Sequence, residues 1–122
     1  MTQEDKELLL KDLCARLPYE VKVKCEKYSF PVTILYSGNI DEVKFKETGG
    51  IENICTIKPY LFPFSSMTKE QENEYQYITE RWMYDPSYSI SDSTDWLNKN
   101  HFDYRGLIEK GLAIDATGLN IY

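Results

Sequence analysis

Histidine and cysteine are scarce in this sequence, and their scarcity excludes several kinds of site. The 122 residues include one histidine, His101, and three cysteines, Cys14, Cys25 and Cys55. Separations of 11 and 30 residues between the cysteines are too wide for a zinc knuckle, and an odd number argues against a secreted disulfide framework. We therefore expect no metal site and no disulfide. We expect reduced, mostly buried thiols in a cytoplasmic protein.

Long apolar runs and a basic leader are also missing. The opening "MTQEDK" lacks the charge and apolar core of a signal peptide, and no apolar stretch approaches the roughly 18 residues that span a bilayer. Lysine and arginine total 14 against 20 acids, a net charge of −6. Non-specific binding to nucleic-acid phosphates needs clustered cations, so this balance disfavours nucleic acid as a partner. We expect no contact with membranes.

The sequence lacks a pattern typical of catalysis. His101 has no patterned partner, and none of the cysteines stands at an expected helix N-terminus, where its pKa would fall. The glycine segments "SGN" (37–39) and "TGG" (48–50) are too short to be phosphate-binding loops. Clustered acids stand at helix starts, where they favour the helix dipole. We predict a non-enzymatic protein without a cofactor, with His101 in a loop or at a helix cap.

The residues that are present predict a helix followed by strands. Thr2 can cap a helix that Pro18 ends, and its apolar face would comprise Leu9, Leu10, Leu13, Cys14 and Leu17. Alternating apolar residues then predict strands over 19–27, 30–36, 42–47 and 51–58, with turns at "SGN" and "TGG". Short strands joined by tight turns predict a four-stranded antiparallel meander, either a curled sheet or a small open barrel.

Helices are predicted again in the second half. Thr68 and Gln71 form a capping-box pattern before a helix over 69–84, which Asp85-Pro86 stops. Its buried stripe would be Tyr75, Ile78 and Trp82. A helix capped at Ser93 or Thr94 and a second over 104–110, capped by Asp103 and closed by Gly111, would follow. The fold class is thus α+β: one domain over 1–122, with three C-terminal helices packed on the sheet.

The hairpin over 93–111 supports two interpretations. In outline it is similar to a helix-turn-helix, so the chain could be a DNA-binding accessory protein with Arg105 and Lys110 near the groove. A recognition helix, however, needs more cations and long polar side chains than this segment offers. The favoured interpretation is a packed core, in which Trp96 and Leu107 are buried and close to each other. Its members would be Trp96, Leu97, Phe102, Leu107, Ile108 and Leu112.

Aromatic residues are the remaining signal. The chain holds ten tyrosines, five phenylalanines and two tryptophans. Tyr77, Arg81 and Tyr84 recur at helical spacing opposite the expected buried stripe, and tyrosine and arginine dominate interface hot spots. They predict a face that binds another protein or a second copy of this chain. Alternatively, these tyrosines cover a helix that lies between the sheet and the hairpin.

Two blocks carry a resemblance to a known group. At "PYLFPFSSMT" (59–68) and "DWLNKNHFDYRGLIEKGLAID" (95–115), about a quarter of the chain, the sequence resembles short uncharacterised proteins. These are encoded by gut anaerobic bacteria and by their prophages and mobile elements. The group has no assigned activity, cofactor or catalytic residue. The resemblance implies a cytoplasmic accessory protein of phage or mobile-element type.

Overall fold

The computed structural model describes residues 1–39, 41–81, 83–87 and 90–122, and the fold is α+β. Helix α1 (Gln3–Arg16) comes first, followed by strands β1 (Lys22–Cys25), β2 (Val32–Asn39), β3 (Glu42–Phe45), β4 (Ile51–Asn53) and β5 (Ile57–Leu61). Helices α2 (Lys69–Arg81) and α3 (Ile90–Lys99) follow, and β6 (Ile114–Asp115) is the last strand. Among the described residues, no helix has the length and apolar content to cross a bilayer.

The sheet has six strands rather than the predicted four. Its order is β4-β3-β2-β1-β5-β6, antiparallel throughout except for the parallel pair β5–β6, and it does not close into a barrel. The expected strand over 51–58 is interrupted by a 3₁₀ turn at Ile54–Thr56, because the Asn53 side chain accepts the Cys55 N–H at 2.8 Å and caps that turn. The chain then crosses to the far side of β1, where Val23 pairs with Pro59. The predicted antiparallel meander is therefore present as β1 to β4, but it was incomplete, because β5 and β6 extend the sheet beyond β1.

The two predicted turns have different outcomes. At 48–50 a turn forms, and Gly49 takes a φ of 66°, a left-handed conformation that glycine adopts without strain. At 37–39 the backbone instead continues β2 to Asn39, with an irregularity in the register between Ser37 and Asn39. Glycine in a strand is typical of such a bulge, so "SGN" marks an irregular strand rather than the turn itself.

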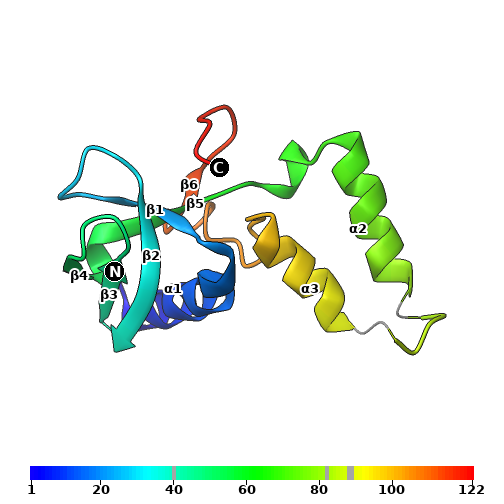
Figure 1. Cartoon of the computed structure of the whole chain (residues 1–122), viewed down its shortest axis with the longest axis horizontal. Helices are drawn as coiled ribbons and strands as arrows, with labels where there is room; N and C mark the ends of the chain where they lie inside the picture. Colours follow the sequence, from blue (N-terminus) through cyan, green and yellow to red (C-terminus); the bar gives the residue numbers. More distant parts are fainter. Residues whose placement is uncertain (40, 82, 88–89) are drawn as a thin grey trace.

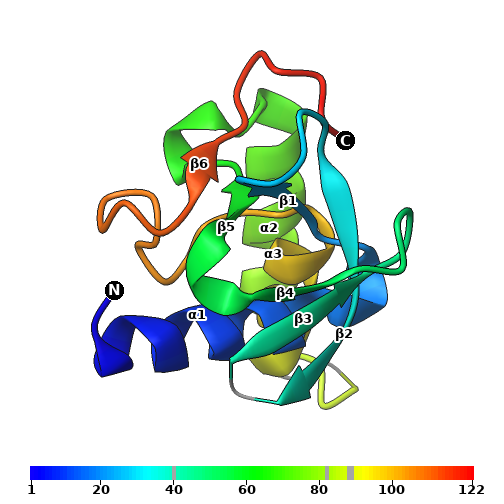
Figure 2. The same cartoon turned by 90° about the vertical axis from the view of Figure 1, so that its left-hand side faces the viewer.

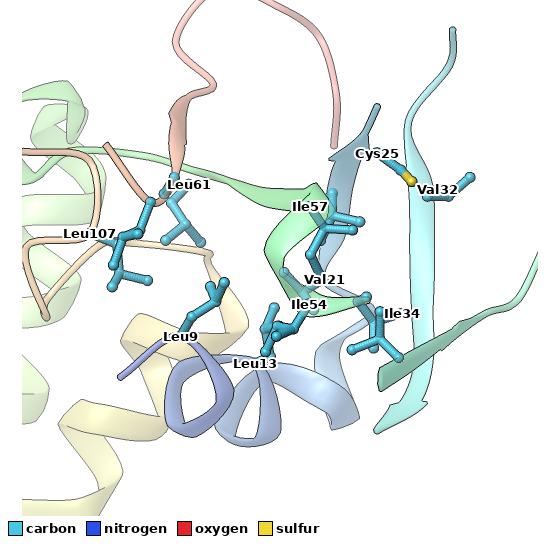
Figure 3. Packing of buried hydrophobic residues seen from close by; sticks show 14 of the residues in the cluster. Leu9, Leu13, Val21, Cys25, Val32, Ile34, Ile54, Ile57, Leu61 and Leu107 are labelled. Carbon is cyan, nitrogen blue, oxygen red and sulfur yellow. The ribbon is translucent and has the colours of Figure 1, made fainter. Parts of the chain in front are cut away.

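The main core lies between α1 and the sheet (Figures 2 and 3). Leu9 and Leu13 point from α1 toward Ile54 and Ile57, as Figure 3 shows, and all four are at most 1% exposed. Thr2 caps the helix as predicted, since its hydroxyl accepts the Asp5 N–H at 3.1 Å. Each fully buried aliphatic side chain stabilises the fold by about 1.5–3 kcal/mol, so this layer is the main source of stability.

Helices α2 and α3 form an arm at one side of the molecule rather than a layer on the sheet (Figure 1). The predicted capping box is present: Gln71 N–H donates to the Thr68 hydroxyl at 3.1 Å, and Thr68 N–H donates to the Gln71 side chain at 2.9 Å. The arm has its own small core of Trp96, Leu97 and Phe102. Phe62, Met67, Tyr75, Ile78 and Tyr104 pack against that core.

The third expected helix, over 104–110, is absent, because the described backbone there forms only turns. Gly106 has a φ of 73° and Gly111 a φ of 75°, and a left-handed residue inside so short a segment ends any helix. Asp103 accepts hydrogen bonds from the Leu107 and Ile108 N–H groups, so it caps a turn. The prediction of three C-terminal helices on the sheet was therefore wrong.

Trp96 and Leu107 are both buried, at 7% and 0% exposure, as predicted. They belong to different clusters, however. Trp96 lies in the core of the arm, and Leu107 packs in the main core with Leu112 and Ala113. The expectation that these two side chains lie together was wrong, because the turns at 103–111 return the chain to the sheet.

A buried ion network joins α1 to the segment that leaves the arm. Arg16 and Asp12 are both 0% exposed, and their side chains form two hydrogen bonds of 2.8 and 3.1 Å. Arg16 also donates to the Phe102 carbonyl at 2.6 Å. Arg105 donates to Asp12 at 3.0 Å and to the Tyr104 hydroxyl at 2.7 Å. The network therefore fixes the base of the arm against α1.

Candidate interaction face

Helix α2 is held by one face only. None of its described residues is fully buried. Tyr75 and Ile78 are half-buried against the arm core, and the Tyr75 ring lies 5.5 Å from the Trp96 ring. These two members of the predicted stripe therefore pack inward, against α3 rather than against the sheet. The third, Trp82, lies outside the described residues.

The opposite side of α2 exposes the predicted site. Tyr77 is 52% exposed, and the Arg81 guanidinium lies 5.1 Å from the centre of its ring, within cation–π range. Arg81 also pairs with Asp85 at 3.6 Å. Tyrosine beside arginine on a rigid helix offers a flat aromatic surface and several hydrogen-bond donors at little entropic cost.

Tyr84 is part of the same region but not of the helix. The helix ends at Arg81, and Tyr84 lies in the following turn, where its N–H donates to the Arg81 carbonyl at 3.0 Å. It is 81% exposed, and neighbouring Met83 is 63% exposed. Met83 was not predicted as part of the site. The sequence feature that could have identified it is a flexible apolar side chain next to a tyrosine, a combination common in adaptable binding surfaces.

We call Tyr77, Arg81, Met83 and Tyr84 the outer face of α2. The helix is acidic at its start, with Glu70 and Glu72, and Arg81 is in its last turn. Tyr77, Met83 and Tyr84 are more than half exposed. The outer face can thus bury apolar and aromatic surface against a partner without any rearrangement of the arm core.

The structure does not provide the helical hairpin over 93–111 that the DNA-binding interpretation needs. Arg105, a proposed groove contact, is only 17% exposed in its side chain and pairs with Asp12. Lys110 is exposed but lies in a turn rather than on a recognition helix. The segment therefore lacks the helix that would enter a major groove, and one of its two cations is engaged inside the protein.

His101 lies in a turn with a φ of 63°, as the loop prediction required. It is 8% exposed, and its ring stacks on Tyr122 with centres 3.7 Å apart. Burial is the main cause that lowers the pKa of His101 to about 4, and the positive charges of Arg16 and Lys22 lower it further. A histidine with so low a pKa is poorly matched to base catalysis near neutral pH.

The cysteines differ from the prediction in their burial. All three are free thiols, but only Cys25 is buried, whereas Cys14 and Cys55 are exposed. The expectation of mostly buried thiols was wrong because Cys14 lies on the outer side of α1 and Cys55 lies in the 3₁₀ turn after β4. None of the described contacts joins a thiol to His101. Over the described part of the chain, no group of His, Cys, Asp and Glu side chains has metal-binding geometry.

Two surface pockets of about 220 Å³ each are present among the described residues. One lies over β1 and β5 and is lined by Lys24, Glu26, Cys55, Thr56, Lys58 and Ile114. The other lies at the base of the arm and is lined by Phe62, Ser66, Thr68, Gln71, Phe102, Thr117 and Gly118. The outer face of α2 contributes to neither.

Comparison with protein-family models, curated proteins and solved structures gave no match.

Proposed function

We propose that this chain is a small non-enzymatic interaction module, and that the outer face of α2 binds another protein or a second copy of the chain. The observation that carries the proposal is that α2 has no fully buried residue, while the side facing away from α3 exposes Tyr77 and is followed by exposed Met83 and Tyr84. A helix held by one face can gain apolar contacts on the other when a partner covers it.

The arrangement of the outer face supports this proposal energetically. Tyr77 is held beside Arg81, and Arg81 is held by Asp85, so little side-chain freedom remains to be lost on binding. Stable interfaces bury about 800 Å² on each partner. One helix face supplies only part of that area, so we infer that the partner also contacts the neighbouring surface of the arm.

We also propose that the protein acts in the cytoplasm as an accessory protein of phage or mobile-element type. The free thiols of Cys14, Cys25 and Cys55 support a reducing compartment. The blocks at 59–68 and 95–115 support the origin through the group that they resemble. DNA binding through 93–111 is the weaker candidate, because Arg105 already pairs with Asp12.

An affinity comparison tests the outer face. Self-association is measured by sedimentation velocity over a range of concentrations, and hetero-association by calorimetry with a partner captured from the host and then purified. Tyr77→Ala and Tyr84→Ala should each weaken association by more than about 1 kcal/mol, roughly fivefold. Phe30→Ala is the matched control, since Phe30 is another exposed aromatic (48%) in the segment before β2. Equal affinities for all four proteins would refute the assigned face.

A further inference from the structure

Two lysines face each other on the outer surface of the sheet. In the antiparallel ladder of β1 and β5, Lys24 lies directly opposite Lys58. Adjacent residues of the two strands, Cys25 and Ile57, are buried in the core that α1 covers (Figure 3). Because successive side chains of a strand point to opposite faces, both lysines point to solvent, and both are exposed. Like charges directly opposite each other on one face of a sheet are destabilising.

No carboxylate neutralises this pair of lysines. Among the residues that the structure describes, none of the ion pairs includes Lys24 or Lys58. Nearby Lys27, in contrast, pairs with Glu52 at 3.1 Å. The chain has 20 acidic residues against 14 basic ones, so the pair does not lack a carboxylate because acidic residues are scarce. Two neighbouring positive charges therefore remain available to a negatively charged ligand.

Both lysines line the surface pocket of about 220 Å³ over β1 and β5. Glu26 lines the same pocket and is exposed, and it belongs to none of the ion pairs among the described residues, so two ammonium groups stand against one carboxylate. Ile114 adds an apolar wall. A dry cavity of about 150 Å³ is large enough to hold benzene. The pocket therefore has room for a phosphate group together with a small organic group attached to it.

We propose that this pocket binds a small organic phosphate, and that Lys24 and Lys58 are the two contacts to its phosphate group. A phosphate monoester carries a charge of about −1.5 to −2 at neutral pH, which matches two ammonium groups, whereas a carboxylate matches only one. The bound anion would offset the repulsion between the lysines through charge-assisted hydrogen bonds to both. Glu26 repels the phosphate, so the organic part of the ligand lies on its side and donates a hydroxyl to it. The site shares no residue with the outer face of α2.

Titrations with inorganic phosphate and with glycerol phosphate test this site, with binding followed by amide chemical shifts at constant ionic strength. The shifts should gather at Lys24, Cys55 and Lys58 and should saturate with a dissociation constant of about 1–10 mM, as two exposed charge-assisted contacts permit. Chloride at the same ionic strength should not produce them. Lys24→Gln and Lys58→Gln should each weaken binding by about tenfold. Lys11→Gln is the matched control, because Lys11 is an exposed lysine on α1.

A charge reversal separates binding from a structural role of the lysines. Lys58→Glu places a carboxylate opposite Lys24, so its melting temperature without phosphate should be no lower than that of the wild type, while phosphate binding should be lost. The proposal is overturned if the wild-type shifts do not saturate, if chloride reproduces them, or if both glutamine variants bind phosphate as tightly as Lys11→Gln does. It is also overturned if Lys58→Glu melts at a lower temperature and still binds phosphate.

Discussion

At the scale of single residues, the pair of Asp12 and Arg16 is the most demanding feature of the core. Both side chains are fully buried, and Arg105 adds a second positive charge against the same carboxylate. Removing two charges from water costs several kcal/mol each, and mutual attraction offsets that cost only when the hydrogen bonds are well formed. The geometry of the Asp12–Arg16 pair is bidentate, so loss of Asp12 would leave the buried Arg16 guanidinium without its counter-charge.

Truncation of the shared carboxylate should therefore be severe. Asp12→Ala leaves the Arg16 guanidinium buried without its counter-charge, and the free energy of unfolding should fall by about 3–5 kcal/mol in chemical denaturation. Glu7→Ala on the same helix is the control, because Glu7 is exposed and makes only a 3.4 Å contact with Gln3. Similar losses for the two variants would show that the buried network contributes no more to the free energy of unfolding than an exposed side chain does.

The buried histidine should make stability depend on pH. Its pKa is about 4 in the folded protein and near 6.5 when unfolded, so the unfolded chain takes up a proton first as the pH falls. The stability due to His101 is complete above about pH 6.5 and is lost as the pH falls toward about 4, by at most about 1.4 kcal/mol per pH unit. Denaturation curves between pH 6.5 and 5 isolate this effect, because carboxylates titrate lower.

His101→Asn is the matched variant for this measurement, since asparagine tolerates the left-handed backbone found at this position. Its free energy of unfolding should change less between pH 6.5 and 5 than that of the wild type. Parallel pH profiles would contradict the account of His101 as a buried neutral ring.

The residue scale also shows why part of the structure could be predicted. The caps at Thr2 and at Thr68 with Gln71 depend on side chains three residues apart, so the sequence contains all that forms them. The contact of Arg105 with Asp12 joins residues 93 positions apart. No local sequence pattern encodes such a pair. For that reason, Arg105 was considered as a possible DNA contact.

At the scale of elements, the position of α2 along the chain was predicted correctly, but the surface against which it packs was not. Periodicity predicted which side of the helix packs inward, and Tyr75 and Ile78 do so. The same periodicity cannot say whether the packing surface is a sheet or another helix. It is α3, and the arm therefore stands beside the sheet (Figure 1). Strand β5 was not predicted as a strand of its own, because one strand was expected over 51–58 and only tertiary pairing shows that the chain crosses to β1 after β4.

The two sides of the arm should respond differently to truncation. Trp96→Ala should cost about 3–5 kcal/mol, because Trp96 is 7% exposed and stacks on Phe102 at 5.6 Å. Tyr77→Ala and Tyr84→Ala should leave the melting temperature nearly unchanged, since both residues are more than half exposed. Thermal unfolding of the three variants gives the comparison. A large loss for either tyrosine would mean that the outer face is structural.

At the scale of the whole molecule, the chain consists of a body with a well-filled core and an arm with a smaller one. Leucines from α1 and mainly valines and isoleucines from the strands fill the body, whereas the arm core is largely aromatic. The network of Asp12, Arg16 and Arg105 ties the base of the arm to α1, and the arm projects from there (Figure 1). A projecting helix with an exposed aromatic side is suited to binding a groove or a second helix on a partner.

Site-specific photo-crosslinking tests this account most directly. A benzoylphenylalanine placed at position 77 should form a discrete covalent adduct on irradiation, with a second copy in the purified protein or with a partner in host lysate. The same photo-reactive residue at position 30, another exposed aromatic position, should not form that adduct. We expect the yield of the adduct from position 77 to fall when Tyr84→Ala is added, at protein concentrations below the dissociation constant. No adduct from position 77, or equal adducts from positions 77 and 30, would contradict the assignment of the outer face of α2.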